Sequence, residues 1–141
     1  MDFMTSFKIC GSGLAAQRAK MDVITSNLAN VSTTRTAEGG PYKKKTVSLT
    51  AEGVEGHFDS TIKDALKAVK IEGVTEDPNA VKMVYDPAHP DADANGNVAV
   101  PNINVVTEMA DMIMASRAYE AVVTAFDATK NMALKTLEMG R

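Results

Sequence analysis

The chain has 141 residues, of which 45% are hydrophobic and 5% aromatic, and its formal net charge is −3. This length predicts one domain, or one small domain with extensions. So mild a charge argues against nucleic acid as the main partner. The single cysteine, Cys10, excludes a disulfide bond within the chain. No stretch approaches the ~18 apolar residues of a membrane span, so we expect no direct insertion into a membrane.

The first residues, Met1 to Lys8, lack the basic segment and the long apolar run of a secretory signal. Taken alone, this pattern predicts a cytoplasmic protein. Export by a route that needs no cleaved signal would leave the same pattern, so the sequence start leaves both locations open.

Residues 1–31 have the apolar periodicity of a long helix. The apolar residues recur at alternating steps of four and three, which is the a/d pattern of a heptad repeat, with one polar member, Gln17. Gly11 and Gly13 each weaken a helix by about 1 kcal/mol relative to Ala, and they mark a bend or a close backbone contact. The series consists of Phe3, Phe7, Cys10, Leu14, Gln17, Met21, Ile24, Leu28 and Val31.

Residues 32–103 predict a small β-rich region. Short runs that alternate in polarity indicate strands at 45–50, 68–71 and 81–85, and glycines and prolines separate them. Residues 57–65 fit either a short helix or a loop. Residues 86–96 are rich in Pro, Asp and Asn and predict a loop, which we call the Asp/Pro loop.

Residues 104–141 predict a second long helix. Asn104 can cap its start and Gly140 can end it. Its residues again alternate by four and three: Val105, Met109, Met112, Ser116, Tyr119, Val123, Phe126, Lys130, Ala133 and Leu137. The predicted fold class is therefore α+β, with long N- and C-terminal helices that form a coiled-coil hairpin around a small β-rich middle.

The lengths of the two helices favour an assembly subunit. At ~1.5 Å per residue they would be about 40 and 50 Å long, which is more than a small middle region covers. Apolar residues outside the main series would stay exposed, and such surfaces usually mark a protein interface. The alternative is an ordinary helical core closed by the β region. The residues outside the series are Met4, Ala16, Val23, Val106, Ile113, Val122, Ala125 and Met132.

The strongest pattern for another function is a partial calcium loop. Asp91, Asp93, Asn95 and Gly96 match the first half of an EF-hand. The twelfth position is Asn102, where the motif needs a bidentate Glu. A turn whose Asp and Asn side chains bond to their own backbone is the favoured interpretation.

No set of residues forms a catalytic or cofactor pattern, so we expect no enzyme activity, no cofactor and no metal. His57 and His89 lack ligand spacing, and Cys10 lies on the apolar series as a small hydrophobe. Three remaining groups have ordinary structural interpretations. They are a solvated strand edge at Lys43, Lys44 and Lys45, acids favoured at a helix start at Glu108 and Asp111, and a helix end at Asn27 and Asn30.

Two segments carry a resemblance to a known family. The run Ser26-Asn27-Leu28-Ala29-Asn30-Val31-Ser32-Thr33-Thr34 resembles the N-terminal signature of bacterial flagellar rod and hook proteins. The Asp/Pro loop and the stretch from Gly96 to Met109 are similar, more narrowly, to proximal-rod subunits. Residues 116–121 and 124–130 match the C-terminal helix of that family. The resemblance covers well over half of the chain.

This resemblance implies a subunit of the flagellar drive shaft that is exported through the flagellar type III apparatus without signal cleavage. Such subunits assemble helically in the periplasm, and their terminal helices pair as a coiled coil inside a hollow tube and become ordered on assembly. The implied partners are other copies of the chain, other rod proteins, the rod-to-ring adaptor and the export apparatus. The alternatives are a helical adaptor or export chaperone and a calcium-binding module.

The predicted subunit interface follows from the helix series and the signature turn. Asn27 and Asn30 have two interpretations: they form hydrogen bonds between subunits or within a turn, or they simply end the helix. Tyr119 fits either an interface contact or packing between the two helices. The candidate residues are Phe3, Phe7, Leu14, Met21, Ile24, Asn27, Leu28, Asn30, Val106, Met109, Ile113, Tyr119, Val122, Phe126, Met132 and Leu137.

Overall fold

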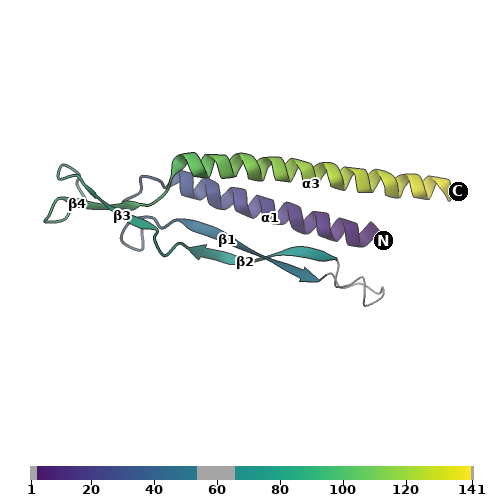
Figure 1. The fold of residues 1–141 in the computed structure, drawn as a ribbon, viewed down its shortest axis with the longest axis horizontal. Coiled ribbons are helices and arrows are strands. Elements are labelled where there is room, and N and C mark those ends of the chain that lie inside the picture. The colour runs from purple at the N-terminus through teal and green to yellow at the C-terminus, as the bar shows by residue number, and fades with distance from the viewer. Residues whose placement is uncertain (1–2, 54–65, 141) are drawn as a thin grey trace.

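The computed structural model describes residues 3–53 and 66–140. In chain order it contains helix α1 (Phe3–Ala29), strands β1 (Lys45–Gly53), β2 (Lys67–Glu76), β3 (Val81–Tyr85) and β4 (Asn97–Pro101), and helix α3 (Val105–Met139) (Figure 1). The α+β class with a long helix at each end and a small antiparallel β middle is confirmed. The open choice between helix and loop at 57–65 falls outside the described residues. The division at 31 and 103 into three segments stays a prediction.

The two long helices lie side by side and run in opposite directions (Figure 1). The rings of Phe7 and Phe126 have centroids 5.0 Å apart. A Cβ on Gly13 would lie 3.6 Å from Val122, so Gly13 marks a close contact, and α1 continues unbroken through both of its glycines. Phe3 precedes Phe7 by four residues and therefore lies opposite about position 130 of α3. The last residues of α3, 131–139, extend beyond α1, and we call them the α3 overhang.

The buried residues of the two helices are small or polar, with the exception of Ile24. The buried residues of α1 are Ala16, Ile24 and Asn27, and those of α3 are Glu108 and Ala115. On α3 the buried positions lie one residue before Met109 and Ser116 of the predicted series, and Met109 is exposed. The predicted series is wrong there because Glu108 is neutralised by Lys44, 2.8 Å away, and an ion pair across the fold is invisible to a hydrophobic pattern.

Strands β1 and β2 form an antiparallel pair that packs along α1. Val47 pairs with Val74, and the register shifts between Ser48 and Leu49. The backbone N–H of Val69 donates to Ser12 Oγ at 3.1 Å, which ties β2 to the middle of α1. Helix α1 thus lies between α3 and this strand pair, as Figure 1 shows, while α3 packs mainly against α1.

Strands β3 and β4 form a second antiparallel pair at the end of the molecule away from the chain termini (Figure 1). The sequence pattern predicts β3, but it does not separate β4 from the surrounding β region. A small second core consists of Ala80, Val98, Pro101 and Ile103, all buried. This core lies apart from the two helices, so the heptad pattern of the helices does not indicate it.

The Asp/Pro loop joins β3 to β4 and is stabilised by its own backbone. Asp93 Oδ1 accepts hydrogen bonds from the N–H groups of Asn95 (2.8 Å) and Asn97 (2.9 Å). Gly96 adopts φ 77°, a left-handed conformation that suits glycine. The favoured prediction, an Asx-type turn, is confirmed. Within residues 3–53 and 66–140, no three His, Cys, Asp or Glu side chains are grouped to hold a metal ion.

Candidate assembly surfaces and the polar joint

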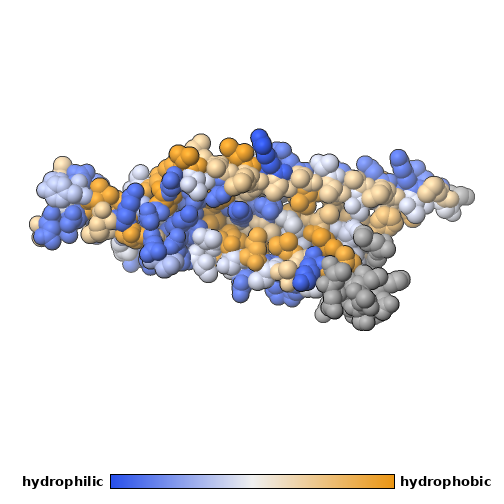
Figure 2. Space-filling view, viewed as in Figure 1, coloured by the Kyte–Doolittle hydropathy of each residue, from blue (hydrophilic) through white to orange (hydrophobic). Residues whose placement is uncertain are grey.

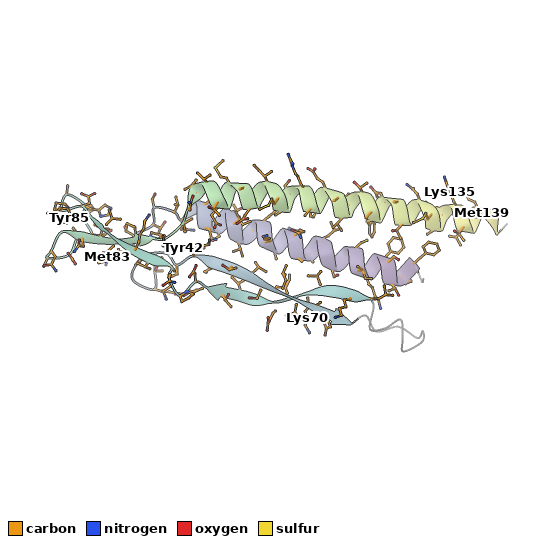
Figure 3. All side chains as sticks on the ribbon, viewed as in Figure 1. Tyr42, Lys70, Met83, Tyr85, Lys135 and Met139 are labelled. Carbon is orange, nitrogen blue, oxygen red and sulfur yellow. The ribbon has the colours of Figure 1, made fainter. Side chains whose placement is uncertain are left out.

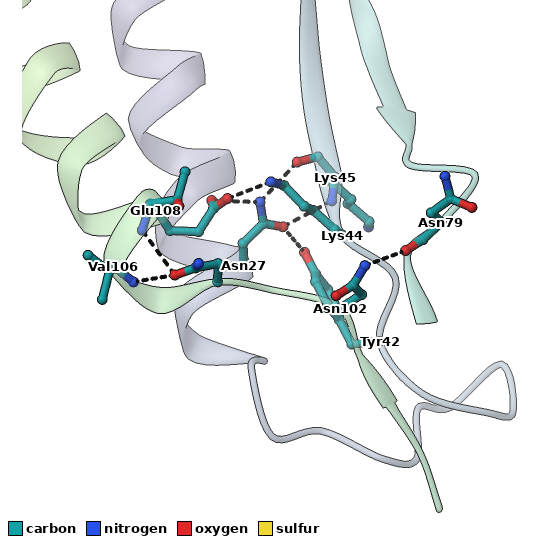
Figure 4. Close-up of polar contacts among 10 residues, drawn as sticks. Asn27, Tyr42, Lys44, Lys45, Asn79, Asn102, Val106 and Glu108 are labelled. Carbon is teal, nitrogen blue, oxygen red and sulfur yellow. Dashed lines mark hydrogen bonds and ion pairs between the residues drawn. The ribbon is translucent and has the colours of Figure 1, made fainter. Parts of the chain in front are cut away.

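A cluster of polar side chains, most of them buried, joins the two helices to the start of β1 (Figure 4). It consists of Asn27, Tyr42, Lys44 and Glu108 together with the backbone of Lys45, and we call it the polar joint. Asn27 comes from the last turns of α1, and Glu108 comes from the first turn of α3. Tyr42 and Lys44 precede β1, and Lys45 is its first residue. The joint therefore brings together parts of the chain that are up to 81 residues apart.

The amide of Asn27 fills its hydrogen-bonding capacity inside the joint. Its Nδ2 donates to the backbone oxygen of Lys45 (2.9 Å) and to Glu108 Oε2 (3.1 Å). Its Oδ1 accepts from the hydroxyl of Tyr42 and from the N–H of Lys45, both at 3.0 Å. The residue is only 1% exposed. A side chain that is buried and fully bonded within its own chain lies outside any surface that a neighbour could touch.

Glu108 is the second buried member of the joint, with 2% of its surface exposed. Its Oε1 lies 2.8 Å from the Nζ of Lys44, whose side chain is 26% exposed. The prediction that Lys44 belongs to a solvated strand edge is therefore wrong, because it neutralises a buried acid. Asn104 caps this end of α3 by accepting from the N–H groups of Val106 and Thr107, as predicted.

The turn that follows α1 contacts the Asp/Pro loop through one side-chain hydrogen bond. Asn30 Nδ2 donates to the backbone oxygen of Ser26 at 2.9 Å, and Thr33 Oγ1 donates to Asn30 Oδ1 at 3.2 Å. Thr34 Oγ1 donates to Asp91 Oδ2 at 2.8 Å. The two family-like motifs found in the sequence therefore touch one another. In the structure, Asn30 therefore forms hydrogen bonds within the turn, which is one of the interpretations given for it above.

The outward side of the first turns of α3 is an apolar stripe, consisting of Val106, Met109 and Ile113. Spacings of three and four place these residues on one side of the helix. Val106 is 77% exposed, and the other two are more than half exposed. The space-filling view shows hydrophobic colour gathered over this start of α3 and, separately, along β1 and β2 (Figure 2). We call these three residues the α3 stripe.

The α3 overhang carries a second exposed apolar group, made of Met132, Leu134, Leu137 and Met139. Leu137 is 71% exposed. Residues two apart on a helix lie about 200° apart around its axis, so Met132 and Leu134 point to opposite sides. A helix that is apolar on several sides is normally surrounded by other protein. Met139 marks the free end of α3 in Figure 3.

A third exposed apolar surface lies on β3, where sequence reasoning assigned no function. Met83 and Tyr85 are 62% and 72% exposed and lie at the end opposite the overhang (Figure 3). They are two residues apart and therefore share one face of the strand. The signal in the sequence was the run of apolar residues at 81, 83, 84 and 85, which is more apolar than a solvated strand requires.

The structure separates the sixteen predicted interface residues into three sets. Ile24 and Asn27 are buried within the chain, and their predicted contact with a neighbouring subunit stays a prediction. Eight are half-buried: Phe7, Leu14, Met21, Leu28, Asn30, Tyr119, Val122 and Phe126. Six are exposed: Phe3, Val106, Met109, Ile113, Met132 and Leu137.

Two family models match the chain. Residues 8–35 match the model described as flagella basal body rod protein. Residues 94–139 match the one described as flagellar basal body rod FlgEFG protein C-terminal. The first segment contains most of α1 and the turn after it, and the second contains β4 and α3. Neither description names an enzyme. In the described residues, no helix is both long and apolar enough to cross a membrane.

The chain is also similar to curated proteins along nearly its whole length. It is 42% identical over 147 positions to the flagellar basal-body rod protein FlgC of Bacillus subtilis, with 96% of this chain and 97% of the relative covered. The FlgC proteins of Borreliella burgdorferi (40% identity, 94% and 93% covered) and Salmonella typhimurium (39%, with both chains covered completely) are similar to it as well. The chain therefore belongs to the FlgC family of flagellar basal-body rod proteins.

Proposed function

We propose that this chain is a structural subunit of the flagellar basal-body rod that assembles with copies of itself and with other rod proteins through the exposed apolar surfaces of its helices. The observation that carries this proposal is the uncovered apolar surface of α3, at the α3 stripe and at the α3 overhang. Surfaces of this kind mark interfaces when they are contiguous and exposed.

The positions of the two surfaces favour an open assembly. The α3 stripe lies at the start of α3, beside the polar joint, and the α3 overhang lies at the other end of that helix (Figure 1). Different surfaces far apart on an elongated subunit suit heterologous contacts, which build helical filaments when they do not close into a ring. In this proposal the paired terminal helices form coiled-coil contacts along the inner wall of a hollow tube. That tube transmits torque and lets export substrates pass.

The proposed interface keeps the six exposed residues of the predicted set and excludes Ile24 and Asn27. The eight half-buried residues serve mainly in packing within the chain and lie at the margins of the interface. The proposal also includes export through the flagellar type III apparatus, a place in the periplasmic part of the basal body, and contact with the rod-to-ring adaptor.

The test places charge on the α3 stripe in cells that lack their own copy of the gene. The double variant Val106→Asp, Ile113→Asp puts two carboxylates on the proposed interface without touching the helix contact. We expect the variant to fold, as judged by circular dichroism, but to be absent from isolated basal bodies viewed by electron microscopy.

The matched control is Thr124→Asp. Thr124 is exposed and follows Val106 by 18 residues, which is five helical turns, so it lies on the same side of α3 at a polar position. It should support normal rods. Rods of normal number and length with the double variant would refute the proposed interface. A small closed oligomer of the purified protein would favour the adaptor or chaperone instead.

A further inference from the structure

The polar joint is an unusual way to join two helices whose other contacts are apolar. Asn27, Tyr42 and Glu108 are buried and Lys44 is partly exposed, and each hydrogen-bonding group of Asn27 and each oxygen of Glu108 has a partner. A buried ion pair adds little stability compared with apolar residues of the same volume, but it penalises arrangements that leave it unpaired. We propose that the polar joint fixes the register in which α3 packs against α1.

Outside the joint, the contact at Gly13 does not distinguish registers sharply. Gly13 faces Val122, and the residues one heptad before and after Val122 are Ala115 and Thr129. Each has a side chain no larger than valine, so each fits against a glycine. Sliding α3 by seven residues in either direction therefore keeps this part of the contact closely packed.

The aromatic contact between the helices would be kept if α3 slid by one heptad in one of the two directions. Phe7 packs on Phe126, with the ring planes at 56°. The residue one heptad earlier on α3 is Tyr119, so a slide in that direction would replace one aromatic pair by another. A slide in the other direction would place Ala133 opposite Phe7 and lose the ring contact.

The polar joint, in contrast, tolerates neither slide. A shift of seven residues moves Glu108 by about 10 Å along the helix axis, away from both Asn27 and Lys44. In one direction Asn27 would then face Ala115, which offers no hydrogen bond. A buried amide without partners is strongly unfavourable, as is a buried charge. The joint therefore acts as a positioning group that excludes the neighbouring registers.

The register has a direct consequence for the surface of the molecule, because it sets how far α3 extends beyond α1. A slide of one heptad would lengthen the α3 overhang by seven residues or remove most of it. If the overhang is an assembly surface, which rests on the proposed function, then the joint sets its length from the far end of the helices.

The experiment measures the register directly, in the full-length chain with Cys10→Ala. Gly13→Cys is combined in turn with Val122→Cys, which reports the observed register, and with Ala115→Cys or Thr129→Cys, which report the two slides. Disulfide formation under mild oxidation at low protein concentration is quantified on non-reducing gels. With the native joint, we expect the 13–122 bond to exceed either other bond by about tenfold.

The joint is then replaced by apolar residues of similar size: Asn27→Leu, Lys44→Met and Glu108→Met. We expect at least one of the slid pairs to form to within about twofold of the 13–122 pair, because the penalty on wrong registers is gone. Val98→Ala is the control. It creates a cavity in the β3–β4 core, away from both helices, and should lower stability while leaving the cross-link ratio unchanged.

A folded joint variant that keeps the native cross-link ratio would overturn the inference. If the triple variant does not unfold cooperatively in urea, Asn27→Leu alone is put through the same comparison, and an unchanged ratio in that variant overturns it equally. The measurement uses unassembled chains, so its result stands whether or not the proposed rod interface is correct.

Discussion

At the scale of single residues, the molecule depends on buried polar groups that are matched one to one. Glu108 uses one oxygen for Lys44 and the other for Asn27, and Asn27 in turn holds Tyr42 and the start of β1. Within the described residues, no buried side-chain nitrogen or oxygen lacks a hydrogen-bond partner. Such a network is stable only as a set, because the removal of one member leaves the others desolvated and unpaired.

The first prediction concerns Glu108→Ala. This change leaves the ammonium of Lys44 and one N–H of Asn27 without an acceptor. Breaking a fully buried pair costs about 3–5 kcal/mol, and because Lys44 is partly solvated we expect a smaller loss of stability, about 2–3 kcal/mol. The measurement is the urea midpoint of unfolding, followed by circular dichroism.

The control for this prediction is Glu52→Ala. Glu52 pairs with Lys70 at 3.1 Å, but both side chains are 59% exposed, so the loss should be at most about 1 kcal/mol. Similar midpoint shifts for the two variants would contradict the view that the polar joint is the stronger contact.

At the scale of elements, burial is confined to one half of the helix pair. Among the described residues of the two helices, the buried ones run from Ala16 to Asn27 on α1 and from Glu108 to Ala115 on α3. The far halves touch through half-buried residues such as Phe7 and Phe126. Since helices are held in proteins mainly by tertiary packing, the two halves should differ in stability.

The second prediction is a gradient of amide exchange in the free chain. Amides of residues 17–27 and 108–118 should exchange slowly, with protection close to that of global unfolding. Amides of residues 4–12 and 120–139 should exchange much faster, because few contacts oppose local unfolding there. Mass spectrometry of peptides from the unassembled protein measures both sets at once.

This gradient refines the expectation that the terminal helices become ordered on assembly. Only the far halves should gain protection in assembled rods, since the near halves are already held by the polar joint. Equal protection along the whole of α1 in the free chain would show that the helix pair is uniformly stable.

At the scale of the whole molecule, the two ends present different surfaces. One end carries the β3–β4 pair and the Asp/Pro loop, and the other carries the chain termini and the α3 overhang (Figure 1). A subunit with two unlike ends can add in one direction and leave the same kind of end exposed each time, which is the requirement for a growing filament.

The third prediction tests whether the α3 overhang is an assembly surface. Leu134→Glu combined with Leu137→Glu places two charges on the α3 overhang beyond the helix contact, so the free energy of unfolding should change by less than about 0.5 kcal/mol. Assembly into rods should fail, and cells that carry only this variant should not spread in soft agar. Lys135→Glu changes the charge of a neighbouring exposed residue and should leave swimming intact. Normal spreading with the double variant would rule out the overhang as an assembly surface.

Sequence patterns alone predict the α+β class, the two long helices, three of the four strands in the described residues, the Asx turn and the family. These features follow from local patterns: heptad spacing, alternation, capping by Asn104, and turn-forming Asp, Asn and Gly residues. The exposed stripe at Val106 and Ile113 was also visible, because those residues are apolar and outside the main series. Each of these patterns lies within a few residues along the chain, so it can be recognised without knowledge of the fold.

The fold was needed to identify which residues the helices bury and where the two helices meet. The burial of Glu108 in place of Met109 depends on Lys44, which is 64 positions away in the chain, and no periodicity in α3 contains that information. Asn27 changed from a candidate surface residue to a buried one for the same reason, since its partners come from β1 and α3. The physical reason is that desolvation of a polar group depends on partners brought together by folding, whereas hydrophobic spacing depends on neighbours in sequence.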